Sequence, residues 1–176
     1  MLEKNLSLLK IITYGHPVLI QKAAAIQDIT EDIEKLARSM AHTMHSTPGI
    51  GLAAPQVNQS IRLITVDLSV GEKEHDLFIL INPEIVNQEG EWMMEEGCLS
   101  VPEINEKVKR PVRVVVKGID LKGKEVTIEA ENLLARVFCH EVDHLEGKLF
   151  IEHLSPLKRD IIKRKLKKQM KTGKTS

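Results

Sequence analysis

The segment FCHEVDHLEGKLF, residues 138–150, contains the pattern H-E-x-x-H, formed by His140, Glu141 and His144. If this stretch is helical, the two histidines lie four residues apart and point to the same face. Two imidazoles in that arrangement can hold a metal ion, and the glutamate between them can move protons for a bound water. A catalytic site of this kind normally takes three protein ligands and one water. The segment therefore leaves one ligand to be found.

The familiar position for a third ligand downstream is empty. Metalloproteases with H-E-x-x-H-x-x-G-x-x-H carry a further histidine at the end of that pattern, and this chain follows it only as far as Gly147. The ligand position holds Phe150 instead. Glu152 and His153 follow, and then a strongly basic segment whose only acid is Asp160. We therefore expect the third ligand upstream of the motif. An H-E-x-x-H zinc metalloprotease remains the alternative function.

Length and composition are those of one globular domain. The chain has 176 residues, of which 42% are hydrophobic and 28% charged. No apolar run approaches the ~20 residues that a membrane helix needs, and the N-terminus shows no secretory or import signal. We therefore expect a cytoplasmic protein without membrane contact. The two cysteines are too few for a disulfide framework, so we expect Cys139 to be a buried thiol.

The formal net charge of zero hides an uneven distribution. Residues 158–174 contain nine Lys or Arg and one Asp, a balance of +8, so the remainder carries −8. Basic segments of this kind often bind polyanions. A cap residue followed by proline, Ser155-Pro156, predicts the start of a helix here. We expect its apolar stripe to dock on the body of the protein; the stripe consists of Leu157, Ile161, Ile162, Leu166 and Met170.

The order of the expected elements predicts an α+β fold with an antiparallel or mixed sheet. Apolar residues at helical spacing predict a helix over 29–45, capped by Asp28 or Thr30, and a second helix over 131–145 that carries the H-E-x-x-H motif. Strand-like runs occupy residues 61–68, 76–86, 113–120 and 124–130. The segment GIGLAAPQV, residues 49–57, is too rich in Gly and Pro to be regular structure.

Two upstream segments could complete the metal site. EGCLS, residues 96–100, offers the Cys98 thiol in a turn-like stretch after a glycine. A thiolate with two imidazoles is a sound ligand set for a first-row metal. GIGLAAPQ, residues 49–56, lets backbone approach a ligand closely and ends in Gln56, whose amide can donate to a developing oxyanion.

Together the three segments resemble the signature motifs of the peptide deformylase family. GIGLAAPQ, EGCLS and HEVDHLEG stand in that family's order at comparable separations, and YGHPVL and GKLF are similar too, so the resemblance covers roughly residues 8–155. It implies antiparallel or mixed sheets packed around a central metal-binding helix, with an N-terminal helix and a basic C-terminal helix. We expect a single catalytic domain over 1–157 and a basic helix and tail over 158–176.

The resemblance also implies the composition of the metal site. Cys98 becomes the third ligand beside His140 and His144, and one position is left for water. The site would hold one divalent ion, in this family usually Fe²⁺, although Zn²⁺, Ni²⁺ or Co²⁺ can occupy the same ligands. The sequence itself does not choose among these metals.

The implied reaction is hydrolysis of the N-formyl group from N-formyl-methionyl nascent polypeptides, with release of formate. Glu141 would act as general base and then as general acid. The Gln56 amide and the backbone N–H of Leu99 would hold the oxyanion. The peptide would lie along backbone much as an added strand, with Arg136 at the mouth of its methionine pocket. The residues expected to bind the substrate are Ile50, Gly51, Met94, Gly97, Leu133, Arg136 and Val137.

The basic C-terminal helix implies a further partner, since it is similar to the helix with which some deformylases contact the ribosome. We expect the protein itself to be a monomer. The chain departs from the family pattern at Cys139, where many members have Gln, and at Ile20 and Ile104-Asn105, where Arg is frequent. None of these departures removes a ligand or the base. The last two predict weaker contacts to the peptide downstream of methionine.

Two other classes stay open beside the metalloprotease. A structural metal site would need four protein ligands, and a fourth is not evident in the sequence. A cysteine hydrolase would use Cys98 as nucleophile with a nearby histidine as base, and its activity should survive a chelator.

Overall fold

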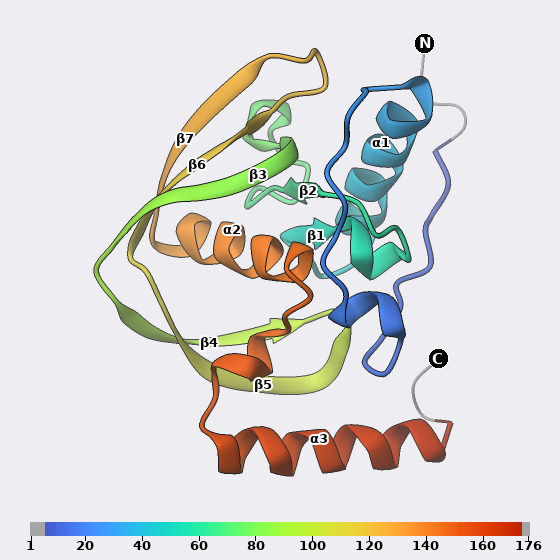
Figure 1. Ribbon diagram of the computed structural model, residues 1–176, viewed down its shortest axis with the longest axis vertical. Helices are drawn as coiled ribbons and strands as arrows, with labels where there is room; N and C mark the ends of the chain where they lie inside the picture. The colour runs from blue at the N-terminus through green and yellow to red at the C-terminus, as the bar shows by residue number, and fades with distance from the viewer. Residues whose placement is uncertain (1–5, 174–176) are drawn as a thin grey trace.

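A central helix, α2 (Asn132–Leu145), carries the H-E-x-x-H motif and lies between two antiparallel sheets in the computed structural model, which describes residues 6–173 (Figure 1). The larger sheet has the strand order β1-β2-β3-β6-β7 and the smaller one is the hairpin β4-β5. The strands are β1 (Gly51–Ala53), β2 (Leu63–Val66), β3 (Phe78–Glu89), β4 (Trp92–Cys98), β5 (Val101–Arg110), β6 (Arg113–Ile119) and β7 (Glu125–Glu131). The predicted α+β class, with sheets packed around the motif helix, is confirmed.

The two sheets share a continuous backbone on one side of α2. β3 runs into β4 through Gly90, whose φ of 67° provides the change of direction, and β5 runs into β6 within two residues. β3 also shifts register against β6 between Ile81 and Glu84 and again between Ile85 and Asn87. Such irregularities bend a strand. The chain therefore wraps α2 instead of forming one flat sheet (Figure 1).

The buried face of α2 packs against the larger sheet. Ala135, Phe138 and Leu145 are fully buried and belong to one apolar cluster with Ile64, Val66, Val114 and Val116. The Phe138 ring meets Phe78 edge-on at 5.6 Å between centroids. Burying side chains of this size typically stabilises a fold by about 1.5–3 kcal/mol each. This packing fixes the rotation of α2 and so decides which side chains face the hairpin.

Helix α1 (Glu31–His45) covers the β1–β2 end of the larger sheet (Figure 1). The Thr30 Oγ1 accepts a hydrogen bond from the Ile33 N–H, and three acidic residues lie in the first turn, where the helix dipole favours negative charge. Met40 and Met44 are fully buried in a cluster with Leu52 and Leu63. The predicted helix and its Thr30 cap are thus confirmed.

Helix α3 (Pro156–Lys171) lies outside β5, and the Ser155 Oγ accepts a hydrogen bond from the Lys158 N–H at its start, as the Ser-Pro signal predicts. The expected five-residue stripe is wrong in part. Ile162 and Leu166 are buried against β5 and the 3₁₀ helix η4 (Phe150–His153), whereas Leu157 is 73% and Ile161 56% exposed. At about 100° per residue, Leu157 and Leu166 point to opposite sides of the helix. The helix therefore docks by a narrower face than expected.

Two sequence expectations about strands need correction. GIGLAAPQV is regular in part, because Gly51–Ala53 pairs with β2 as β1 and Ala54–Val57 forms the 3₁₀ helix η2. The β4–β5 hairpin was missed altogether. Its alternation is broken at Glu103, whose positive φ of 62° changes which side chains face inward, and the inward positions include the charged Glu96 and Arg110. A two-residue period of apolar residues is therefore lacking.

Two further short 3₁₀ segments, η1 (Pro17–Ile20) and η3 (Glu74–Asp76), connect these elements. Within residues 6–173, none of the helices has the length and apolar character required to cross a bilayer.

Candidate metal centre

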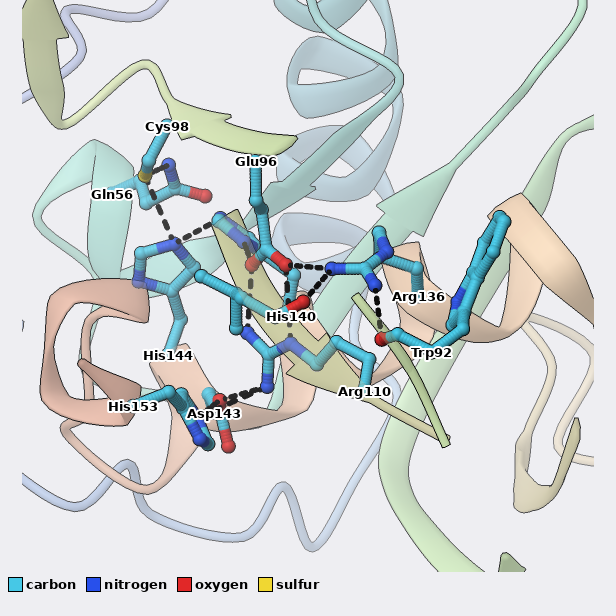
Figure 2. Close-up of polar contacts among 11 residues, drawn as sticks. Gln56, Trp92, Glu96, Cys98, Arg110, Arg136, His140, Asp143, His144 and His153 are labelled. Carbon is cyan, nitrogen blue, oxygen red and sulfur yellow. Dashed lines mark hydrogen bonds and ion pairs between the residues drawn. The ribbon is translucent and has the colours of Figure 1, made fainter. Parts of the chain in front are cut away.

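Three side chains of types that can bind a metal meet where the end of β4 approaches α2. Cys98 is the last residue of β4, and His140 and His144 lie one turn apart on α2. The Cys98 Sγ lies 3.3 Å from the His144 Nε2, which lies 3.2 Å from the His140 Nε2. The three ligand atoms all fall within 4.8 Å of one another (Figure 2). The fold thus brings together the three ligands named from the sequence.

This donor set fits a divalent first-row metal ion. Ligands bound at their usual lengths to a tetrahedral ion lie about 3.3–3.6 Å apart, close to the separations above. The His140 Nδ1 is hydrogen-bonded to Glu96, which leaves its Nε2 to face Cys98 and His144. Among the described residues no fourth protein ligand joins the group. Three ligands with one free position are typical of a catalytic site, whereas structural sites are closed by four.

Glu96 orients His140 and is itself held by two arginines (Figure 2). Its carboxylate accepts hydrogen bonds from the Arg110 Nη2 at 2.7 Å and the Arg136 Nη1 at 2.9 Å, besides the one from His140. Burial alone would raise the pKa of Glu96, but the hydrogen bonds from His140 and Arg110 hold it well below its usual range. An ionised carboxylate on the far nitrogen of a ligand histidine fixes the ring and increases its basicity.

Arg110 carries this network to the outer side of the site. Its Nη1 lies 2.6 Å from the Asp143 Oδ2 and 3.1 Å from the His153 Nε2, which lies 2.7 Å from the same Asp143 oxygen. Sequence reasoning gave Asp143 and His153 no role in the site. Their partner comes from a distant strand, so no local pattern marks them. The contacts are visible only once β5, α2 and η4 are in place.

Glu141 lies beside the ligands and away from solvent. Its side chain is buried, and its Oε2 has no hydrogen-bond partner among the described residues. Burial raises the pKa of Glu141 to about 7, although the charge of His140 opposes the shift. A Cβ placed on Gly51 would overlap the Glu141 Oε1, so the carboxyl group rests against the α-carbon of Gly51. An unpartnered carboxyl group of this kind is suited to accept and return a proton near neutral pH.

The two expected oxyanion donors, the Gln56 amide and the Leu99 N–H, lie next to Cys98. The Gln56 Oε1 accepts a hydrogen bond from the Ala53 N–H at 2.9 Å, which turns the Nε2 toward Cys98 Sγ at 3.6 Å. Leu99 occupies the turn between β4 and β5. Within residues 6–173 its N–H makes no backbone hydrogen bond. Both donors are therefore near the ligand cluster, and the Leu99 N–H is available.

A cavity of about 500 Å³ opens beside the ligands. One wall is a single face of α2, formed by residues at helical spacing: Leu133, Arg136, Val137, His140 and Glu141. The opposite wall comes from the backbone-rich segments Pro48–Gly51 and Glu95–Leu99, so Ile50, Gly51 and Gly97 line it as expected. Within the part of the chain that the structure describes, β1 pairs only with β2, and β4 pairs only with β5. Their other edges can accept an extended peptide.

Two of the expected substrate contacts differ in the structure. Met94 is not among the residues that line the cavity. Alternation along β4 places its side chain on the same face as Glu96, two residues further along the strand from Cys98. Arg136 lines the cavity but is 2% exposed, so it does not flank the mouth. Its guanidinium is directed into the protein, where it bonds Glu96 and the carbonyl oxygens of Val108 and Trp92. Charge-assisted hydrogen bonds to the ionised Glu96 offset the hydration that the guanidinium loses on burial.

Fold and site together define a class: an α+β protein in which an H-E-x-x-H helix and an upstream cysteine bring together three side chains that can hold a metal ion. The sequence model described as polypeptide deformylase matches residues 8–160. The chain belongs to the polypeptide deformylase family, whose members are hydrolases that remove the formyl group from nascent polypeptides.

Similar proteins match most of the chain. The peptide deformylase of Syntrophobacter fumaroxidans is 53% identical over 94% of this chain and 98% of its own length. That of Thermodesulfovibrio yellowstonii is 50% identical over 92% of this chain and 98% of its own. The crystal structure of a peptide deformylase from Legionella pneumophila superposes with a TM-score of 0.88 at 40% identity, covering 97% of this chain and 99% of that one.

Proposed function

We propose that this chain hydrolyses the N-formyl group of N-formyl-methionyl nascent polypeptides with the residues of the metal centre described above. The observation that carries the proposal is the convergence of Cys98 Sγ with the Nε2 atoms of His140 and His144 beside the unpartnered carboxyl group of Glu141. When bound, a divalent ion supplies a Lewis acid that lowers the pKa of water from ~15.7 toward ~7.

In this proposal Glu141 accepts the proton of the attacking water and later delivers it to the departing amine. Its burial and its pKa of about 7 support both steps, because a group that exchanges protons near neutral pH can act in either direction. The Gln56 amide and the Leu99 N–H donate to the formyl oxygen as it becomes negative. Losing one such donor typically costs ~3 kcal/mol of barrier.

The substrate peptide is proposed to lie extended between the edges of β1 and β4, along Ile50, Gly51 and Gly97. The methionine side chain would enter the cavity against Leu133 and Val137, which offer an apolar wall on α2. The formyl carbon would then lie close to the three ligands and to Glu141. Asn105 lines the same cavity and carries no charge, which supports the expectation of weaker contacts to the peptide downstream of methionine.

For the metal we propose Fe²⁺, as the family resemblance implies. The same thiolate and imidazole ligands also suit Co²⁺, Ni²⁺ and Zn²⁺, which the general affinity series favours over Fe²⁺, so the availability of each metal decides which ion is bound. Elemental analysis of protein purified without oxygen, with iron in the medium and no chelator, tests this choice. Zinc at one equivalent per chain, with no iron, would contradict it.

The metalloprotease alternative is not favoured by the structure around α2. Phe150, at the position of the downstream ligand, is 1% exposed and stacks on the His140 ring at 6.2 Å between centroids. A side chain in that place shields the metal helix and offers no ligand. Cys98→Ala should abolish metal binding here, whereas a protease with another third ligand would keep its metal.

The direct test of the proposed function is formate release from formyl-Met-Ala-Ser by anaerobically purified protein. We expect turnover that a chelator removes and added metal restores, since a cysteine hydrolase would be indifferent to both. Glu141→Ala should bind metal normally and lose at least ~100-fold in kcat. Turnover by that variant comparable with the parent protein would contradict the role given to Glu141.

We also propose that α3 contacts ribosomal RNA and that the protein acts as a cytoplasmic monomer at the ribosome. Leu157 and Ile161 are exposed on α3 among its basic residues, which supports an outward-facing binding surface. Binding to ribosomes should weaken steeply with salt and disappear when residues 158–176 are deleted. Equal binding by the truncated protein would refute the contact. The same truncation tests the proposed division into a catalytic unit, 1–157, and a basic helix.

A further inference from the structure

The two oxyanion donors of the proposed mechanism come from segments that share no element of secondary structure. Gln56 lies in η2, and Leu99 lies in the turn between β4 and β5. A donor stabilises a developing charge best when it is already held in place, because it then costs no reorganisation during the reaction. The contacts that hold these two segments against each other are therefore of functional interest.

Ser100 joins the turn to Gln56 by a side-chain contact. Its side chain is completely buried, and its Oγ accepts a hydrogen bond from the Gln56 Nε2 at 3.3 Å. The amide cannot turn over without losing the bond from the Ala53 N–H to its oxygen. Ser100 does not line the cavity, although both Gln56 and Leu99 do. Its hydroxyl group can therefore influence the reaction only through its neighbours.

A strap of N-terminal backbone, residues 11–14, joins the same two segments from outside. The Ile12 N–H donates to the Gln56 carbonyl oxygen at 2.8 Å, and the Tyr14 N–H donates to the Ser100 carbonyl oxygen at 2.8 Å. In an extended chain, residues two apart face the same way, so one edge of the strap can serve both segments. The side chains of the strap pack in two different places. Ile11 packs on the apolar cluster that contains Met40 of α1, and Tyr14 packs on the cluster that contains Leu166 of α3.

We propose that Ser100 and the strap position the Gln56 amide and the Leu99 N–H for the reaction. The inference rests on the proposed function, from which it takes the roles of these two donors. The strap holds the backbone carbonyl oxygen of Gln56, while Ser100 and Ala53 hold its side-chain amide. The backbone carbonyl oxygen of Ser100 accepts a hydrogen bond from the strap, and its hydroxyl group accepts one from the Gln56 side chain. These hydrogen bonds form a closed ring from Gln56 through the strap to Ser100 and back, and Ser100 directly follows Leu99.

A double-mutant cycle on formyl-Met-Ala-Ser hydrolysis tests the side-chain half of this ring. Ser100→Ala should lower kcat about tenfold, the effect of one neutral hydrogen bond, and change KM less than twofold, with metal content and unfolding midpoint close to those of the parent. In a protein that already carries Gln56→Ala, Ser100→Ala should lower kcat by less than about twofold, because the amide that Ser100 holds is no longer present.

Two results would overturn the inference while leaving the proposed function intact. One is an unchanged kcat in Ser100→Ala. The other is a loss of the same factor in both backgrounds, which a general structural effect would give. An unchanged kcat in Gln56→Ala would instead overturn the role of Gln56 in the proposed function, and the inference with it.

The strap is tested by removing one N–H group. Tyr14→Pro eliminates the donor to Ser100, since proline has no backbone N–H, whereas the matched control Tyr14→Ala keeps the donor and loses only the ring. We expect Tyr14→Pro to lower kcat at least about fivefold below Tyr14→Ala, with equal metal content. Equal kcat values in the two variants would exclude a positioning role for the strap.

A measurement on metal-free protein completes the test without relying on activity. In ¹⁵N-labelled protein the Gln56 side-chain NH₂ should exchange its hydrogens at least about threefold faster after Ser100→Ala, since a hydrogen bond that protected it is gone. An unchanged exchange rate would show that Ser100 does not hold the amide and would overturn the inference.

Discussion

At Gly51, the absence of a side chain sets the position of the proposed general base. A Cβ at this position would overlap the Glu141 Oε1 and come within 2.8 Å of the Val137 Cγ1, so any larger residue must displace the carboxyl group. We expect Gly51→Ala to lower kcat about 100-fold, because a shift of about 1 Å in a reacting group has that effect. Kinetics on formyl-Met-Ala-Ser measure this loss.

Metal content and the unfolding midpoint are the controls for Gly51→Ala, since the residue touches no metal ligand in the contacts given above. Both should stay close to the parent values. A variant with full kcat would show that the Glu141 carboxyl group has room to move without consequence.

Asp67 is a buried carboxylate that organises a loop outside the metal centre. Its side chain accepts hydrogen bonds from the Ser69 N–H and hydroxyl, from the Gly71 N–H at 2.9 Å and from His45 at 2.8 Å. Burial alone would raise the pKa of Asp67, but the donors, led by the Ser69 hydroxyl, more than offset this and lower it. The carboxylate therefore stabilises the folded state only while it is ionised.

We expect Asp67→Asn to lower the free energy of unfolding by about 1–3 kcal/mol at pH 7, because the amide NH₂ would face donors. A depressed pKa contributes stability above the unfolded value of about 3.9, and this is lost as the pH falls through the folded pKa. The difference in the free energy of unfolding between the parent and the Asp67→Asn variant should therefore shrink below about pH 3.9. Urea unfolding at a series of pH values measures it, and a constant difference would contradict the assignment.

At the scale of elements, the inward face of the β4–β5 hairpin places the charged side chains of Glu96 and Arg110 against helix α2. Arg110, at the end of β5, is 3% exposed and binds Glu96 and Asp143 in one contact set. Lysine is a point charge and cannot reproduce a guanidinium that engages both partners. We expect Arg110→Lys to weaken metal affinity by about 10–100-fold, measured by competition with a chelator, because groups that orient a ligand histidine contribute that much.

Arg113 on β6 provides a matched control for that substitution. It also pairs with a carboxylate, Glu129 at 2.6 Å, but its side chain is 42% exposed. Exposed ion pairs contribute little. Arg113→Lys should therefore change metal affinity less than about twofold. Similar losses in the two variants would mean that the effect comes from charge in general and not from the link to His140.

The elements differ in how well the sequence predicts them. Helices α1 and α2 begin and end close to the predicted residues, and α3 begins at the predicted Ser155-Pro156, because caps and the 3.6-residue period are local signals. Strands β2, β3, β6 and β7 follow from their apolar runs. The β4–β5 hairpin does not, since its inward side chains include Glu96 and Arg110, and these are tolerated only because they neutralise each other in the folded protein.

At the scale of the whole molecule, α3 ties the C-terminal part of the chain to the back of the site. Leu166 is 1% exposed, in a cluster with Val101 and Ile104 of β5, while Leu157 on the same helix is 73% exposed. We expect Leu166→Ala to lower the free energy of unfolding by about 2–4 kcal/mol, through lost burial and a cavity. Leu157→Ala should change it by less than about 0.5 kcal/mol.

Urea unfolding of both variants at pH 7 tests this contrast. Equal stability of the two would mean that α3 does not dock through Leu166. Since Leu157 belongs to the proposed ribosome-facing surface, its variant should lose ribosome affinity while keeping its stability. The two leucines thus separate docking of the helix from recognition by it.

The sequence by itself predicted the two histidines of the H-E-x-x-H motif, the proposed general base between them and the three principal helices, because each rests on residues a few positions apart. Cys98 was predicted only from the resemblance of three distant segments to one family. Only the tertiary structure decided the rest: that Arg136 turns inward to Glu96, that Asp143 and His153 share Arg110, and that Ser100 meets Gln56. These contacts join residues from different elements, and they depend on how α2 is rotated between the two sheets. Local periodicity indicates which face of a helix is buried but not which side chains of other elements it meets, and these are fixed by the packing of Phe138 and its neighbours in the core.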